Sequence, residues 1–173
     1  MLPKSTLVLG GAASGKSRFA ENLLLTSKLD PVYLATSRSF DAEMETKIKR
    51  HKSRRNDVWL NIEADLDLSG PLENCTATQA VLIDCATMWL TNHIMDDGNI
   101  AQAQHELLSA IDTCAAPVVI VSNEVGHGIV PDNALARSFR EYQGRLNIAL
   151  AEQCSCVVMV TAGLPLALKG TLS

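Results

Sequence analysis

Short runs of apolar, often β-branched residues alternate along the chain with longer segments that mix polar and apolar positions. An uninterrupted apolar run is typical of a strand in a sheet that helices cover on both faces. Such runs predict strands over 6–9, 32–35, 80–84, 118–121 and 157–160, and a weaker run predicts an edge strand over 58–62. The intervening segments predict helices over about 16–28, 41–54, 100–114 and 133–153. This alternation predicts an α/β fold with a mostly parallel sheet flanked by helices.

Length and composition favour a single domain over 1–173. A chain of this size suits one hydrophobic core, and 47% hydrophobic residues exclude a largely disordered protein. The polar stretch 65–79 is expected to be a surface connection within that domain. No apolar run reaches the roughly 18 residues that a membrane span needs, and the N-terminus lacks a signal-peptide pattern. The five cysteines have no metal-ligand spacing, which favours reduced thiols in a cytoplasmic protein.

A glycine-rich loop joins the first expected strand to the first expected helix. This phosphate loop fits the pattern G-x-x-x-x-G-K-[ST] and consists of Gly10, Gly11, Ala12, Ala13, Ser14, Gly15, Lys16 and Ser17. Glycines allow backbone amides to close around phosphate oxygens, and the N-terminus of the following helix attracts negative charge. Lys16 is expected to reach the β- and γ-phosphates, and the Ser17 hydroxyl to bind Mg²⁺. The loop therefore predicts that the protein binds a nucleoside triphosphate.

A carboxylate is expected beside the phosphate loop. Asp84 ends the strand expected over 80–84, which places its side chain at the carboxyl edge of the sheet. This position favours a role as a Mg²⁺ ligand, although an aspartate after a buried strand is also common as a helix cap. The signatures of regulatory GTPases and of transporter ATPases do not occur in the sequence, which leaves phosphoryl or nucleotidyl transfer to a small molecule.

The segment 41–55 concentrates positive charge. Six of the fifteen Lys and Arg residues fall within positions 47–55. On a helix, Lys47, Arg50, His51 and Arg54 would share one face and attract a triphosphate or pyrophosphate. A solvated basic helix is the simpler alternative. A nucleic-acid patch has little support, because the net charge is −4 and aromatic residues make up only 4%.

Further motifs follow in order along the whole chain. They are Y-L-A-T-S at 33–37, D-x-E-M at 41–44, His51-Lys52, Trp59 with Glu63, I-D-C-x-T at 83–87, N-E-V-G-x-G-I-V-P at 123–131, F-R at 139–140, G-R-L-N at 144–147 and A-G-L-P at 162–165. With the phosphate loop, this set resembles the bifunctional adenosylcobinamide kinase / adenosylcobinamide-phosphate guanylyltransferase family of cobalamin (vitamin B12) biosynthesis. The motif at 123–131 is the most specific of them.

The resemblance implies a RecA-like P-loop fold, a homotrimer and two successive reactions. Enzymes of this family phosphorylate adenosylcobinamide with ATP or GTP, then transfer GMP from GTP to the product through a guanylylated histidine and release pyrophosphate. Carried onto this chain, the histidine is His51, and Arg50 stands where some relatives have a second histidine. The nucleotide contacts implied are the phosphate loop, Thr36, Ser37, Arg38, Lys52, Ser53, Arg54, Arg55, Glu63 and Asp84.

Several alternatives stay open at the level of sequence. Glu124 is a candidate for a polar or metal-linked contact, or for a turn contact that caps the following helix. Arg137 and Arg140 lie three residues apart on the last expected helix and would hold phosphates or contact a neighbouring subunit. The alternative functions are a P-loop kinase for another small alcohol and a nucleotide-gated binding module without turnover.

Overall fold

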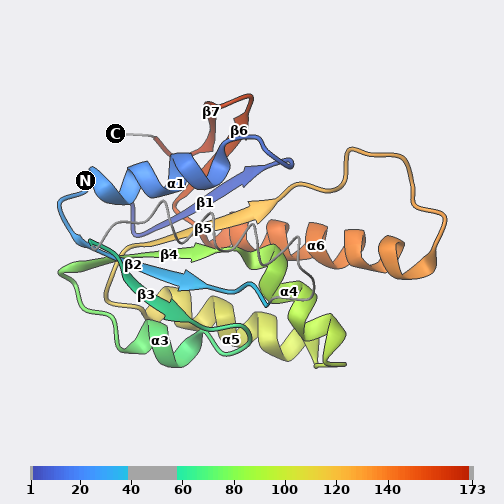
Figure 1. The fold of residues 1–173 in the computed structure, drawn as a ribbon, viewed down its shortest axis with the longest axis horizontal. Coiled ribbons are helices and arrows are strands. Elements are labelled where there is room, and N and C mark those ends of the chain that lie inside the picture. The colour runs from blue at the N-terminus through green and yellow to red at the C-terminus, as the bar shows by residue number, and fades with distance from the viewer. Residues whose placement is uncertain (1, 39–57, 172–173) are drawn as a thin grey trace.

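A computed structural model of the chain describes residues 2–38 and 58–171. Its strands are β1 (Ser5–Gly10), β2 (Asp30–Ala35), β3 (Leu60–Glu63), β4 (Gln79–Asp84), β5 (Val118–Asn123), β6 (Cys156–Thr161) and β7 (Leu164–Lys169). They form one seven-stranded sheet in the order β3-β2-β4-β5-β1-β6-β7 (Figure 1). Neighbouring strands pair in parallel, apart from β6 and β7, which pair antiparallel. The expected α/β fold with a mostly parallel sheet is confirmed.

Helices cover both faces of this sheet (Figure 1). Within residues 2–38 and 58–171 they are α1 (Lys16–Leu25), α3 (Ser69–Glu73), α4 (Ala86–Met95), α5 (Ile100–Thr113) and α6 (Ala134–Gln153). Side chains of α1 pack with one set of strand residues, which includes Val8 and Leu82. The other four helices pack with the alternate residues of the strands, such as Leu7 and Ile83. The two faces of the sheet therefore support two separate apolar layers, as expected for strands covered on both sides.

Most of the predicted elements are present. The five buried strands are confirmed, and the weaker run over 58–62 corresponds to β3, which pairs only with β2 at one edge of the sheet. The helices expected over about 16–28, 100–114 and 133–153 are α1, α5 and α6, with α1 ending earlier, at Leu25. The helix expected over 41–54 lies outside the described residues.

The stretch 65–79 is more than the surface connection that its polarity suggested. It contains α3, whose Leu72 is completely buried, and Leu68 just before it is only 2% exposed. Leu68, Leu72 and Cys75 are spaced by four and three residues, so one helical face reaches the core. Polar residues at the intervening positions concealed this spacing, and the expectation of a surface connection was wrong.

Strand β7 was not expected either, because it is fully exposed and contains a proline. It forms a hairpin with β6 whose two turn residues, Ala162 and Gly163, both have positive φ, at 52° and 79°. Two residues with positive φ make the type of turn that suits the twist of a hairpin. Pro165 is compatible with β7 because the strand lies at the edge of the sheet.

No helix among residues 2–38 and 58–171 has both the length and the apolar character needed to cross a bilayer. The five cysteines all lie in this part of the chain as free, buried thiols.

Replacing Leu72 with alanine tests the packing of α3. The Leu72→Ala substitution leaves a cavity under a fully buried side chain, so we expect the free energy of unfolding to fall by about 2–5 kcal/mol. Urea denaturation measures this change, with the exposed neighbour Glu73→Ala as the control, which should stay within about 0.5 kcal/mol of the parent. Equal stability of both variants would contradict a core role for α3.

Candidate nucleotide-binding site

The phosphate loop connects the carboxyl end of β1 to the N-terminus of α1. Gly15 precedes the helix with φ 95°, a conformation that glycine adopts without strain. At Gly10, a Cβ atom would lie 2.7 Å from the carbonyl oxygen of Val160, so a larger residue would push β1 away from β6. Both positions thus require glycine for a local geometric reason.

The hairpin between β6 and β7 supports the phosphate loop from the side. The Gly163 N–H donates to the Ser14 carbonyl oxygen at 2.8 Å. A Cβ atom on Gly15 would come within 3.2 Å of the Gly163 Cα. The A-G-L-P motif at 162–165 therefore holds the phosphate loop in place, a role that the sequence did not indicate.

The start of α1 is open to an anion. Its N-cap position is occupied by Gly15, and no side chain caps the first turn. The N–H groups of a helix's first turn lack intrahelical partners and carry a partial positive charge. The loop and the helix end together therefore form the geometry that binds phosphate groups.

Lys16 reaches back over this loop. Its Nζ donates to the Gly11 carbonyl oxygen at 3.0 Å. Burial lowers the pKa of Lys16, while the side chains of Cys85 and Asp84 act in the opposite direction. A bound phosphate would add negative charge at the same place and favour the protonated lysine.

Asp84 lies on the same side of the sheet as α1, because Ala80 and Leu82 of β4 pack into the α1 layer and Asp84 follows that alternation. Its Oδ2 accepts a hydrogen bond from the Tyr33 hydroxyl at 2.8 Å. Helix α4 begins after Cys85 and has no side-chain cap. Asp84 is therefore not a helix cap, and its carboxylate lies close enough to Lys16 to act on it electrostatically.

Cys85, the next residue, is not a nucleophile in this site. Burial raises the pKa of its thiol to about 12, and the charge of Asp84 acts in the same direction. The thiol therefore stays protonated at neutral pH.

The residues after β2 are tied to α4. Thr36 is completely buried, and its hydroxyl both donates to the Cys85 carbonyl oxygen at 2.8 Å and accepts from the Cys85 N–H at 2.7 Å. The Asn92 amide donates to the Thr36 carbonyl oxygen at 2.8 Å. In this structure the Thr36 side chain thus positions the junction between β4 and α4.

Arg38 is held by two carboxylates. Its guanidinium donates to Asp65 and to both oxygens of Asp96, the latter at 2.9 and 2.8 Å. The hydrogen bond to Asp65 is the main reason that the pKa of Arg38 is raised, and the same bond lowers the pKa of Asp65. A phosphate at Arg38 would therefore compete with these carboxylates.

The remaining predicted residues fall into two groups. Ser37 follows β2, and Glu63 ends β3 at the same edge of the sheet. The candidate nucleophile and the basic contacts near it lie outside the described residues: His51, Lys52, Ser53, Arg54 and Arg55.

Side chains of the loop itself and of α6 bond to the loop between β5 and α6. A carboxylate oxygen of Glu124 accepts from the Gly126 N–H, and Asn133, not Glu124, caps α6. Arg137 donates to the carbonyl oxygens of Pro131 and Asp132, at 3.0 and 2.7 Å. Of the two alternatives for Glu124, the turn contact is the one present, without the helix cap.

Arg140 acts on the same loop. It donates to the carbonyl oxygens of Ile129 at 2.9 Å and of Gly126 at 2.7 Å. Arg137 and Arg140 are therefore both engaged with backbone carbonyl groups in the structure.

The chain is similar in sequence to a known family over almost its whole length. Residues 6–168 match the family model described as cobinamide kinase / cobinamide phosphate guanyltransferase. This chain belongs to that family. The expected resemblance is therefore confirmed, and the family is one of enzymes.

Two relatives align with this chain over nearly its full length. The bifunctional adenosylcobalamin biosynthesis protein CobP of Pseudomonas aeruginosa is 41% identical over 167 residues, which cover 95% of this chain and 96% of the relative. The bifunctional adenosylcobalamin biosynthesis protein CobU of Escherichia coli is 36% identical over 179 residues, with 94% and 98% covered. The similarity thus spans the chain and includes the phosphate loop.

Solved structures with low sequence identity share the fold. An ATPase of a bacterial type III secretion system superposes with a TM-score of 0.58 at 8% identity, over 92% of this chain and 51% of its own. The RadB recombinase gives a TM-score of 0.50 at 17% identity, over 91% and 74%. These similarities confirm the RecA-like P-loop fold.

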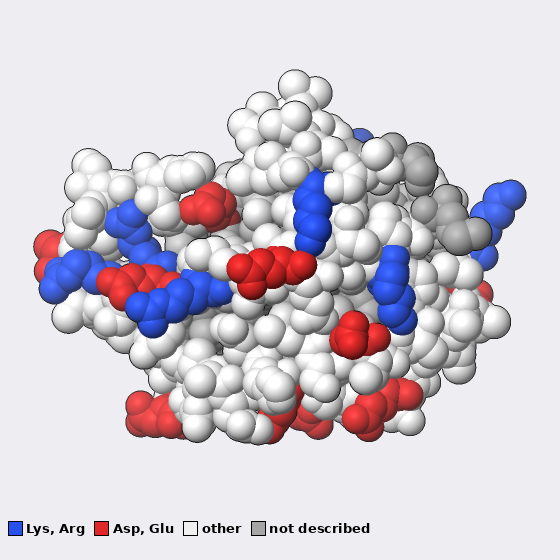
Figure 2. All heavy atoms as spheres, turned by 180° about the vertical axis from the view of Figure 1, so that it is seen from behind, with Lys and Arg blue, Asp and Glu red and all other residues white. Residues whose placement is uncertain are grey.

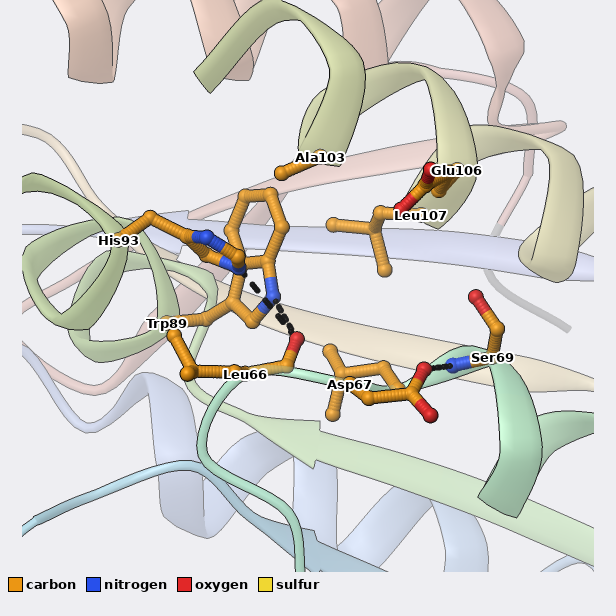
Figure 3. A pocket seen from close by; sticks show the side chains of 9 residues that line it. Leu66, Asp67, Ser69, Trp89, His93, Ala103, Glu106 and Leu107 are labelled. Atoms are coloured by element: carbon orange, nitrogen blue, oxygen red, sulfur yellow. Dashed lines mark hydrogen bonds between the residues drawn. The ribbon is translucent and has the colours of Figure 1, made fainter. Parts of the chain in front are cut away.

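A separate hollow of about 180 Å³ lies between α3, α4 and α5 (Figure 3). The Trp89 ring lines this hollow and donates through Nε1 to the Leu66 carbonyl oxygen at 2.8 Å. The centroids of the Trp89 and His93 rings lie 4.6 Å apart. Trp89 and Leu107 pack on the face of the sheet opposite α1. The hollow is therefore distinct from the phosphate loop, which leads into α1.

Replacing Lys16 with alanine tests the phosphate loop directly. The variant loses one charged hydrogen-bond donor to phosphate, so we expect GTP to bind about 10- to 100-fold more weakly. Calorimetric titration with a GTP analogue that cannot be cleaved measures the affinity. Lys28→Ala removes the same charge beyond the far end of α1 and should leave the affinity unchanged. If both variants bind alike, Lys16 is not a phosphate ligand.

Proposed function

We propose that this protein phosphorylates adenosylcobinamide with ATP or GTP and then transfers GMP from GTP to the adenosylcobinamide phosphate. The observation that carries this proposal is a complete phosphate loop with Asp84 beside it, in a chain that belongs to the cobinamide kinase / cobinamide phosphate guanyltransferase family. The products are adenosylcobinamide-GDP and pyrophosphate, within cobalamin biosynthesis.

In the first reaction, the backbone amides of the loop and of α1 hold the β- and γ-phosphates. Lys16 neutralises charge that develops on the phosphoryl group and the leaving nucleoside diphosphate. The contacts of the backbone amides and of Lys16 with the phosphates are stronger in the transition state than in the bound substrate. The reason is that negative charge shifts toward the leaving group as the bond to the γ-phosphorus breaks.

The residues present fit a magnesium ion. Ser17 is in the first turn of α1, and one oxygen of Asp84 accepts no hydrogen bond from the described residues. Hydroxyl and carboxylate oxygens are the ligands that Mg²⁺ prefers. When bound, Mg²⁺ supplies charge neutralisation between the phosphates. Ser17 and Asp84 would hold it.

In the second reaction, His51 attacks the α-phosphorus of GTP. A nitrogen–phosphorus bond forms, the bond to the pyrophosphate leaving group breaks, and the imidazole becomes guanylylated. The phosphate of adenosylcobinamide phosphate then attacks the same phosphorus and releases His51. Neighbouring positive charges at Lys47, Arg50 and Arg54 in the sequence disfavour the imidazolium and thus keep the nucleophile neutral.

The other nucleotide contacts in this proposal come from the sheet edge and the basic segment. Thr36, Ser37, Arg38 and Glu63 lie at the ends of β2 and β3, and Lys52, Ser53, Arg54 and Arg55 follow His51 in the sequence. At Thr36 the backbone is the more suitable contact, because its hydroxyl is bonded to Cys85. Arg38 would need to exchange a carboxylate partner for phosphate.

We further propose that residues 1–173 act as one domain in a cytoplasmic homotrimer. The projecting β5–α6 loop supports subunit contact, since Ile129 is 96% and Val130 69% exposed. Basic and acidic side chains are interspersed on the face seen in Figure 2, which favours small-molecule substrates over nucleic acid.

Replacing Asp84 with asparagine tests the metal site. Asp84→Asn keeps the shape of the side chain but removes its charge, so the rate of corrinoid phosphorylation should fall and the Mg²⁺ concentration for half-maximal rate should rise by about tenfold or more. Steady-state rates at graded Mg²⁺ concentrations measure this shift. Asp67→Asn on the opposite side of the sheet is the control. An unchanged Mg²⁺ dependence in Asp84→Asn would exclude Asp84 as a ligand.

Replacing His51 with alanine tests the covalent step. GTP labelled at the α-phosphate should label the parent protein through an acid-labile, base-stable phosphoramidate, and should not label His51→Ala. The variant should keep measurable corrinoid kinase activity, because the first reaction does not use the imidazole. His105→Ala, an exposed position on α5, should label like the parent. Covalent GMP on His51→Ala would disprove the assignment.

A further inference from the structure

Strand β5 ends directly beside the phosphate loop. It lies between β4 and β1 in the sheet, and its last residue, Asn123, is paired with Gly10, the first residue of the loop. Val119 and Val121 of β5 pack into the α1 layer. Because strand residues alternate between faces, Asn123 is on the same face as these valines and as α1.

The backbone of Asn123 is fixed on both sides. Its N–H donates to the Thr87 hydroxyl at 2.9 Å, and its carbonyl oxygen accepts from the Asn147 amide at 3.1 Å. The following N–H, from Glu124, donates to the Gly10 carbonyl oxygen at 3.1 Å. The end of β5 is thereby held against both α4 and the phosphate loop.

A buried polar network holds Asn147 in turn. Its Oδ1 accepts from the Ser122 hydroxyl at 2.6 Å and from the Gln143 amide at 2.9 Å. Ser122 and Gln143 are both completely buried. The Gln143 amide nitrogen also donates to the Ser122 hydroxyl at 2.9 Å, whereas the Gln143 Oε1 is buried without a partner. Hydrogen bonds between polar groups in a core favour one arrangement of their side chains. Asn147 of the G-R-L-N motif thus has a structural role, which is to hold the end of β5.

The side-chain amide of Asn123, unlike its backbone groups, has hydrogen-bonding capacity available for a ligand. It makes no hydrogen bond with residues 2–38 or 58–171 and is only partly buried. An amide offers two donor hydrogens and one acceptor oxygen. Such a group, on a rigid backbone beside a phosphate loop, can donate to a phosphoryl oxygen and accept from an alcohol at the same time.

We propose that Asn123 is a catalytic residue of the phosphorylation step, whose amide binds the γ-phosphoryl group of the nucleotide and orients the acceptor hydroxyl. This inference rests on the proposed function. The acceptor oxygen forms a bond to the γ-phosphorus, and the bond between that phosphorus and the bridging oxygen to the β-phosphate breaks. The hydroxyl proton passes to water, since an amide has no titratable site to take it. Asn123 does not contact the α-phosphate, where GMP transfer takes place.

The variants Asn123→Ala and Asn123→Asp separate this role from a structural one. We expect corrinoid phosphorylation to slow by about 100-fold in both, as for the loss of one donor to transition-state charge. At saturating GTP, labelling by α-labelled GTP should proceed at the parental rate. Asn22→Ala, an exposed asparagine on α1, is the matched control.

Binding of uncleavable GTP and of GDP provides a second measurement that needs no corrinoid. The parent should bind the GTP analogue more tightly than GDP. This ratio of affinities should fall about tenfold in Asn123→Ala. It should fall further in Asn123→Asp, because the charge of the aspartate repels the γ-phosphate. This comparison stays informative even if the parent does not phosphorylate adenosylcobinamide. An unchanged preference for the triphosphate, equal slowing of both reactions, or loss of folding in both variants would overturn the proposal.

Discussion

The parallel pairing of β1, β4 and β5 is the constraint on which the site depends. Parallel strands bring their carboxyl ends to one edge of the sheet, and here the register sets Gly10 opposite Asn123 and Asp84 opposite Val121. The central residues of these strands are buried on both faces by helices, so the register cannot slip without exposing apolar side chains. A rigid apolar sheet thus fixes the positions of the few polar groups at its edge.

These polar groups are held by partners from distant parts of the chain. The phosphate loop rests on the β6–β7 turn through Gly163, and Asp84 is bonded to Tyr33 on the neighbouring strand β2. Each partner limits how far the group can move when a nucleotide binds. Preorganisation of this kind reduces the reorganisation needed at the moment of phosphoryl transfer. In our proposal one such site serves two reactions, at the γ- and α-phosphorus of the nucleotide.

Sequence reasoning located the local features of the fold and the site. The buried strands were predictable because a sheet covered on both faces needs uninterrupted apolar runs, and the phosphate loop because its geometry depends on glycines at fixed spacing. Helix α3 was hidden by polar residues between Leu68, Leu72 and Cys75, and β7 by its exposure.

The contacts of Arg38 and Asp84 were not predictable for another reason. They join residues 27 to 58 positions apart in the chain, and depend on a strand order that local patterns do not contain. The Gly163 contact with Ser14 is of the same kind.

The central claim, that one nucleotide site serves both reactions, is tested most directly by counting bound nucleotides. Calorimetric titration of the full chain with an uncleavable GTP analogue and Mg²⁺ should give one nucleotide per chain, and saturation with an uncleavable ATP analogue should displace it competitively. Two nucleotides per chain, or GTP binding that ATP does not affect, would contradict the account.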